Sequence, residues 1–167
     1  FSRICPEVEF RKIYSNLLVQ AGDPKNALQQ YILLIRREPE NSIYYYEAAN
    51  LFEQLKNMLK AMEFYQKTVQ LNENHEEAYI RLGIILKNSK KTKEARKMFQ
   101  RALYINSHNS TASYWLGIIL MENMDYKSAL THFEPALRNP DYKVKTLVAR
   151  GECMILMNRE YEAEPEL

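Results

Sequence analysis

The chain has 167 residues, of which 46% are hydrophobic, so its composition is that of a globular domain able to bury a core. Four glycines and six prolines are few for a β fold, whose turns need both, and the composition favours helix. The net charge of +2 comes from 23 basic and 21 acidic side chains, which excludes a strong field for attracting nucleic acid or an anionic membrane.

No apolar run is long enough for a membrane span. The run from Leu116 to Met121 falls far short of the roughly 20 residues that a spanning helix needs. Cys5 and Cys153 are too few and too far apart for a disulfide framework, and no signal peptide is recognisable. We therefore expect a protein of the cytoplasm or the nucleus without membrane insertion.

One internal period of 34 residues dominates the chain. Alanine recurs at Ala27, Ala61, Ala95, Ala129 and Ala163. Four residues after each alanine stands an aromatic residue or leucine: Tyr31, Tyr65, Phe99, Phe133 and Leu167. Twelve residues before each alanine stands a small residue: Ser15, Ala49, Gly83, Gly117 and Gly151. Residues three or four apart share a helix face, so this pattern predicts two amphipathic helices in each repeat.

The turn between the two helices is marked most clearly in the first repeat. Gly22 is a helix stop, Asp23 an N-cap and Pro24 a residue suited to a first helical turn. In the fourth repeat, Pro135 falls in the last turn of the second helix and predicts that this helix is kinked or shortened.

This pattern resembles the tetratricopeptide repeat family over nearly the whole chain. The third repeat matches the family pattern at Tyr79, Leu82, Gly83, Leu86, Ala95, Phe99 and Ala102. The family's usual proline is present as Pro39 but is replaced later by Glu73, Ser107 and Asp141. The resemblance implies an all-α fold, a right-handed α-α superhelical solenoid of 34-residue helix-turn-helix repeats.

We place a lead-in and five repeats along the chain. The lead-in covers residues 1–7, the complete repeats cover 8–41, 42–75, 76–109 and 110–143, and a truncated fifth repeat covers 144–167. The fifth repeat is expected to end within its second helix. We therefore expect its C-terminal end to fray or to self-associate.

Nothing in the sequence predicts catalysis, a cofactor or a metal. His75, His108 and His132 have no cysteine or acidic partner at metal-ligand spacing, and phosphate loops and nucleophile motifs are missing. A basic run comprises Lys87, Lys90, Lys91, Lys93, Arg96, Lys97 and Arg101. We interpret it as a solvated turn and helix face, with a patch for an acidic partner as the alternative.

In solenoids of this family the first helices line an inner groove, so residues there outside the packing stripe are candidate partner contacts. The candidates are Lys12, Asn16, Tyr46, Asn50, Ile80, Arg81, Ile84, Tyr114, Trp115, Ile118 and Met121. Tyr114 and Trp115 are the expected anchors, because aromatic residues dominate interface hot spots. The alternative is that the apolar members of this row are buried within the protein itself.

The resemblance implies a protein that binds a peptide or an amphipathic helix of a partner protein, as a non-catalytic scaffold or adaptor in a multi-subunit assembly. A substrate-recruiting or regulatory arm of a larger enzyme is the alternative. Family members that clamp a chaperone's C-terminal carboxylate are matched at Lys12, Asn16 and Arg81. Glu47 and Glu77 stand at the other two clamp positions and would repel a carboxylate, which makes this a weaker alternative.

Overall fold

The computed structural model of the chain describes the backbone of residues 6–163 and the side chains of residues 7–158. Every regular element in this part is an α-helix, which confirms the all-α prediction. The helices are α1 (Pro6–Gln20), α2 (Pro24–Arg37), α3 (Ser42–Gln54), α4 (Met58–Leu71), α5 (Glu76–Asn88), α6 (Thr92–Ile105), α7 (Ser110–Glu122), α8 (Tyr126–Ala136) and α9 (Pro140–Ala163). Among them, none is both long and apolar enough to cross a bilayer.

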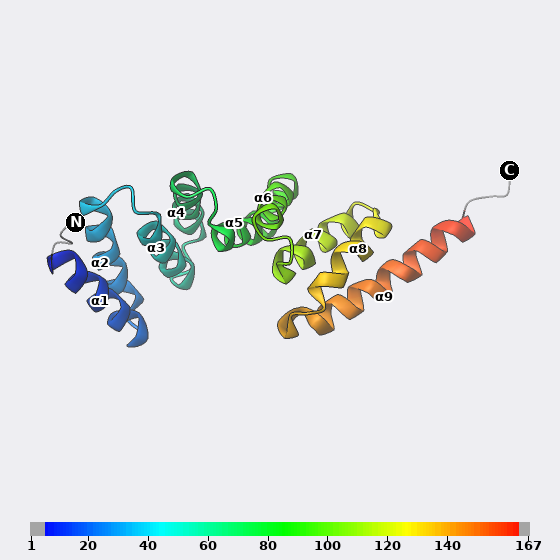
Figure 1. Ribbon diagram of the computed structural model, residues 1–167. Helices are drawn as coiled ribbons and strands as arrows, with labels where there is room; N and C mark the ends of the chain where they lie inside the picture. Colours follow the sequence, from blue (N-terminus) through cyan, green and yellow to red (C-terminus); the bar gives the residue numbers. More distant parts are fainter. Residues whose placement is uncertain (1–5, 164–167) are drawn as a thin grey trace. The chain divides into compact units, whose positions relative to one another are not determined.

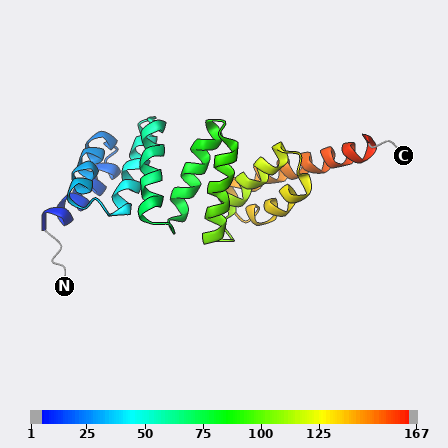
Figure 2. The same cartoon turned by 90° about the horizontal axis from the view of Figure 1, so that it is seen from above.

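The chain divides into two compact units, Phe1–Leu82 and Gly83–Leu167, with the boundary inside α5. In the first unit α1 lies beside α2, and α3 lies beside α4, as antiparallel helical hairpins (Figure 1). In the second unit α7 and α8 form a further hairpin, and α9 packs against both of them (Figure 2).

The turns inside the hairpins repeat the same geometry at the predicted spacing. A left-handed residue follows each of α1, α3, α5 and α7: Gly22 (φ 74°), Lys56 (φ 61°), Lys90 (φ 61°) and Met124 (φ 62°). Asp23 then accepts a hydrogen bond from the backbone N–H of Asn26, as predicted for an N-cap. Asn57 and Asp125 cap α4 and α8 in the same way, whereas Lys91 makes no side-chain cap for α6.

The periodic residues form the core, as predicted. Ala27, Ala61, Ala95 and Ala129 are fully buried. The aromatic residues four positions later, Tyr31, Tyr65, Phe99 and Phe133, are buried beside them. Small side chains at the alanine positions allow the helices to approach closely, and the rings fill the remaining space. The side chain of Ala163, and all of Leu167, lie outside the described residues.

Two glycines of the second unit are required by this packing. A Cβ atom at Gly83 would lie 2.7 Å from the ring of Phe99, and one at Gly117 would lie 2.5 Å from the ring of Phe133. Real Cβ contacts are not this short, so each phenylalanine ring lies against a position where a side chain does not fit. A Cβ atom at Gly151, the next position in the series, would meet nothing within 4 Å.

The fourth repeat departs from the period at Pro135, and the predicted shortening is observed. Helix α8 ends at Ala136 after 11 residues, whereas α2, α4 and α6 each have 14. The next helix then begins at Pro140, and the side chain of Asn139 accepts from the backbone N–H of Asp141. A proline at the first helical position with an asparagine before it is a strong local start signal.

The expectation that the segment 144–167 contains a turn and part of a second helix is wrong for its described part. Helix α9 begins four residues before 144 and continues unbroken to Ala163. The period places the turn and the N-cap at Asn158 and Arg159. Arg159 cannot cap a helix as Asp23, Asn57 and Asp125 do, and no glycine or proline stands there, although the turn at Lys90 and Lys91 also forms without these signals.

Candidate functional site

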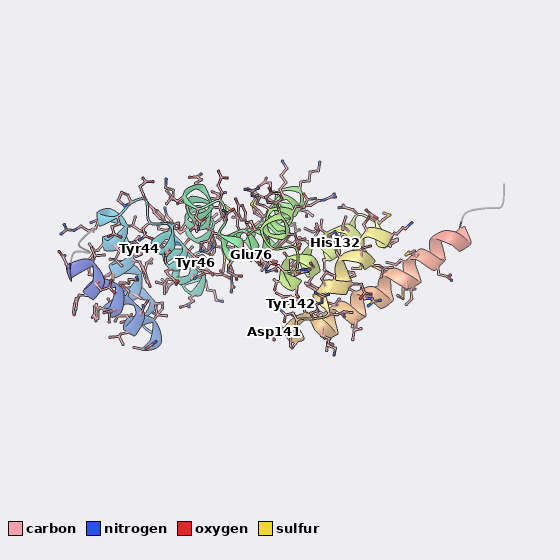
Figure 3. The ribbon with its side chains drawn as sticks, viewed as in Figure 1. Tyr44, Tyr46, Glu76, His132, Asp141 and Tyr142 are labelled. Carbon is pink, nitrogen blue, oxygen red and sulfur yellow. The ribbon has the colours of Figure 1, made fainter. Side chains whose placement is uncertain are left out.

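Three of the predicted groove residues lie around one open hollow in the first unit. Tyr46 and Asn50 come from α3, and Arg81 comes from α5. The hollow has a volume of about 440 Å³. Its remaining lining residues are Val19, Glu47, Leu51, Glu53, Gln54 and Lys56. The structure therefore brings part of the predicted row together, on the side of α3 that carries Tyr46 (Figure 3).

Asn50 is held in place from the second helix of its own hairpin. The phenol of Tyr65 donates to Oδ1 of Asn50 at 2.6 Å, and its oxygen also lies 2.9 Å from Oε2 of Glu53. The equivalent pair one repeat earlier is Tyr31 and Asn16, joined at 2.9 Å. Each of these tyrosines thus fixes a polar side chain that was predicted to point into the groove.

Arg81 closes one side of the hollow and is held by two carboxylates. Its Nε atom donates to Oε1 of Glu77 at 3.0 Å, and its Nη1 atom lies 3.8 Å from Oε1 of Glu53. Burial by itself lowers the pKa of Arg81, but the two carboxylates outweigh that effect and raise it. The guanidinium is therefore a fixed positive charge whose field is already shared between Glu77 and Glu53.

Tyr46 forms an aromatic wall beside this ion-pair network. Its ring centroid lies 4.4 Å from that of His75 and 5.9 Å from that of Tyr65. Burial raises the pKa of the Tyr46 phenol, and the carboxylates of Glu77 and Glu47 raise it further, while Asn50 and Arg81 act in the opposite direction. Tyr46 is thus a neutral hydrogen-bonding group at neutral pH.

His75 has a structural role. Its Nδ1 atom accepts from the backbone N–H of Ala78 at 3.3 Å, so the imidazole caps the start of α5. Asn41 and Asn109 hold the same position in the neighbouring repeats and cap α3 and α7. Burial lowers the pKa of His75. The neutral imidazole fits this role, because a cap must offer a lone pair.

The other predicted residues of the first unit differ in exposure. Lys12 and Asn16 are exposed on α1. Ile80 is 2% exposed and belongs to the core, so its assignment to the groove is wrong. Helix α5 buries side chains on more than one face, and Ile80 is buried together with Tyr79 and Leu82. An amphipathic helix with a single apolar stripe would have left it outside.

In the second unit the two expected anchors, Tyr114 and Trp115, are half-buried by neighbouring rings. Trp115 stacks on Phe99 with centroids 6.3 Å apart and ring planes at 7°. Tyr114 packs against Tyr142 at 4.7 Å and against Phe133 at 6.4 Å. Tyr142, labelled in Figure 3, lies near the start of α9. These contacts favour a packing role for both anchors.

The rest of the apolar row in the second unit is also partly covered. Ile84, Ile118 and Met121 are half-buried. The indole Nε1 of Trp115 is buried, with no hydrogen-bond partner among the described residues. The alternative of self-burial therefore accounts for much of this part of the row, and the exposed polar part lies in the first unit.

Sequence reasoning missed Glu53, which lines the hollow, and His75, which lies beside it against Tyr46. Glu53 accepts from Tyr65 and pairs with Arg81, and His75 packs on Tyr46. The available signal for Glu53 was its position three residues after Asn50, because residues three apart share a face of α3.

The described residues contain no group of three or more His, Cys, Asp or Glu side chains placed to hold a metal ion. Part of the basic run, including Lys91, Lys93 and Arg96, lines an open hollow of about 570 Å³ in the second unit. These side chains are exposed, as expected for a solvated turn and helix face.

A family model matches residues 26–134, which is more than half of the chain, and its description is tetratricopeptide repeat protein 21 second ARM domain. The chain belongs to this family. The matched part of this ARM domain includes the hairpins that carry Tyr46, Asn50 and Arg81. No curated protein matches the chain in sequence.

Solved structures similar to this ARM domain include tetratricopeptide repeat proteins and MamA. MamA 41-end from Desulfovibrio magneticus RS-1 has a TM-score of 0.80 at 18% identity, covering 92% of this chain and 87% of that one. YrrB, described as having an unusual peptide-binding site, has a TM-score of 0.76 at 19% identity, with coverages of 89% and 76%. The first tetratricopeptide repeat domain of Spaghetti (RPAP3), bound to the HSP90 peptide SRMEEVD, has a TM-score of 0.65 at 22% identity. The match covers 74% of this chain and 98% of that one. These likenesses confirm the predicted repeat fold.

Proposed function

We propose that this chain is a non-catalytic protein-interaction module that holds a peptide or helix of a partner on the inner face of its first helices. The observation that carries the proposal is the hollow at Tyr46, Asn50 and Arg81. Its polar side chains are held in place by Tyr65, Glu53 and Glu77 before any partner arrives. Preorganised side chains lose little conformational entropy on binding, which favours recognition at this site.

The similar structures support binding of a peptide. YrrB has a peptide-binding site and the RPAP3 domain is bound to a peptide, each on the same repeat fold. The partner-binding residues that we assign to this chain in the first unit are Lys12, Asn16, Tyr46, Asn50 and Arg81. We place the module in a multi-subunit assembly of the cytoplasm or nucleus.

A chaperone-type clamp for a C-terminal carboxylate has less support here. Glu47 lines the hollow, and Glu77 is paired with Arg81, so two acidic groups stand where that clamp needs amide or basic groups. A carboxylate entering the hollow would meet Arg81 already occupied by Glu77 and Glu53. The module is therefore suited to another kind of peptide.

A matched pair of tryptophan substitutions tests the assignment of the binding face. Gln54 is exposed at the hollow on α3, and Gln66 is exposed on α4 outside it. We expect Gln54→Trp to abolish capture of a partner in affinity purification and Gln66→Trp to leave it intact, at equal helical circular dichroism. Loss with Gln66→Trp alone would place the binding face on the second helices instead.

Self-association at the C-terminal end is a separate part of the proposal. Helix α9 exposes Val144, Leu147, Val148, Met154 and Ile155. Clustered apolar side chains on an exposed helix support an association surface. Sedimentation velocity over a range of concentrations tests it, and we expect Val148→Glu to reduce the sedimentation coefficient at high concentration. Concentration-independent sedimentation of the unsubstituted chain would contradict it.

A further inference from the structure

The hollow on α3 has an uneven distribution of charge. Carboxylates of Glu47 and Glu53 line it, and Glu77 adjoins it through its pair with Arg81. The positive groups are Arg81 and Lys56, and Lys56 is exposed at the turn after α3. Three carboxylates therefore face two cations, and the local balance is negative although the whole chain has a net charge of +2.

Glu47 is the carboxylate left without a cation. The charge of Arg81 is shared by Glu77 at 3.0 Å and Glu53 at 3.8 Å. Glu47 accepts a 3.4 Å hydrogen bond from the neutral Nδ2 of Asn50, and no salt bridge to Glu47 is formed within the described residues. Glu47 is half-buried, so water screens its charge less than that of a surface carboxylate.

The remaining walls also suit a cationic side chain with an aliphatic stem. Tyr46 offers an aromatic ring, whose π electrons attract ammonium and guanidinium groups. Val19 and Leu51 supply apolar surface for the methylene groups of a lysine or arginine. A volume of about 440 Å³ leaves ample room for one such side chain and part of its backbone.

We propose that this hollow takes a lysine or arginine side chain of the partner peptide, with its positive charge paired to Glu47 and its stem against Tyr46. This inference rests on the proposed function, since it names the chemistry of the peptide that the inner face binds. It reverses the polarity of a carboxylate clamp, because acidic groups of the protein meet a basic group of the partner.

Three short synthetic peptides test the pairing. They are acetylated and amidated glycine–serine peptides that differ at one central residue: arginine, norleucine or glutamate. Each is titrated into the isotope-labelled chain, and NMR follows the backbone amide of Glu47 and the side-chain amides of Asn50 and Gln54. We expect the arginine peptide to shift these signals with saturation, and the other two peptides to bind at least about fivefold more weakly.

A matched pair of charge-removing substitutions completes the test. Glu47→Gln keeps the shape of the hollow, and Glu63→Gln makes the same change on α4, outside the hollow. We expect Glu47→Gln to weaken the arginine peptide about fivefold and Glu63→Gln to leave it unchanged. Raising the salt from about 0.1 M to about 1 M shortens the Debye length from about 10 Å to about 3 Å and should also weaken binding.

Failure of this inference is distinguishable from failure of the proposed function. If norleucine or glutamate peptides shift the same signals as strongly as the arginine peptide, or if Glu47→Gln has no effect, the inner face binds peptides but the assigned charge pair is wrong. If none of the three peptides shifts any signal of the hollow at the solubility limit, the proposed pairing of Glu47 with a basic side chain is overturned. The comparison of Gln54→Trp with Gln66→Trp then decides independently whether the inner face is the binding face.

Discussion

The phenol of Tyr65 donates a 2.6 Å hydrogen bond to Asn50, from the second helix of a hairpin to the first. The same bond joins Tyr31 to Asn16 one repeat earlier. In the second unit Phe99 and Phe133 replace the tyrosines, and Ile84 and Ile118 replace the asparagines. The equivalent positions thus carry a hydrogen-bonded polar pair in the first unit and apolar residues in the second.

The first prediction concerns this polar pair. We expect Tyr65→Phe to lower the free energy of unfolding by about 1 kcal/mol, because Asn50 and Glu53 lose a common donor while keeping some access to water. A double-mutant cycle with Asn50→Ala, measured by urea unfolding, should give a coupling of about 1 kcal/mol. Additive effects would mean that the bond does not stabilise the folded chain.

The second prediction concerns the glycines that face phenylalanine rings. A Cβ atom at Gly117 would lie 2.5 Å from the ring of Phe133, so Gly117→Ala must displace the ring or the helix. We expect a loss of about 1–3 kcal/mol in the free energy of unfolding. Gly151→Ala is the matched control, because its Cβ atom meets nothing within 4 Å and alanine favours a helix over glycine by about 0.5–1 kcal/mol. A Gly117→Ala variant that is as stable as the unsubstituted chain, or more stable, would contradict this packing.

The period of the sequence predicted the core well, because burial on a helix follows directly from its periodicity. Ala61, Tyr65 and Phe99 are buried as their positions required. Ile80 was misplaced because α5 is buried on more than one face, which a one-stripe pattern does not encode. The ion pair of Arg81 with Glu53 joins α5 to α3, and its formation depends on how two helices pack rather than on their periods.

The fifth repeat shows where local signals override a period. The 34-residue spacing predicted a helix from residue 144, yet Asn139 and Pro140 start α9 earlier. Its expected turn carries Asn158 and Arg159, and neither stops the helix. An N-cap followed by proline acts on the adjacent residues directly, whereas the period describes the packing of whole repeats.

The third prediction concerns Pro135, which ends α8 early. Proline lacks the N–H that would bond to the carbonyl of Thr131, four residues earlier in the same helix. We expect Pro135→Ala to restore this bond and raise the free energy of unfolding by about 1 kcal/mol. Hydrogen exchange should slow at residue 135 and its neighbours in α8. The hydrogen bond from Ser110 Oγ to the carbonyl of residue 135, now 3.0 Å long, should persist, so a loss of stability would contradict the prediction.

The fourth prediction concerns pH and two partly buried histidines. Burial lowers the pKa of His75, and burial together with the charge of Arg96 lowers the pKa of His132. Glu77 and Glu47 raise the pKa of His75, and Asp125 raises that of His132, but burial prevails in both cases. As the pH falls through the ordinary histidine value of about 6.5, the unfolded chain therefore takes up protons before the folded chain does.

Stability should accordingly be lost as the pH falls from about 7.5 to about 5.5, and urea midpoints at the two pH values measure this loss. His75→Asn is the informative variant, because Asn41 and Asn109 cap α3 and α7 at the equivalent positions. It keeps an acceptor for the start of α5 and removes the titrating group, so its midpoint should depend less on pH than that of the unsubstituted chain. If the urea midpoint of His75→Asn depended on pH as strongly as that of the unsubstituted chain, protonation of His75 would not be linked to folding. The folded chain would then hold the imidazolium of His75 as well as the unfolded chain does.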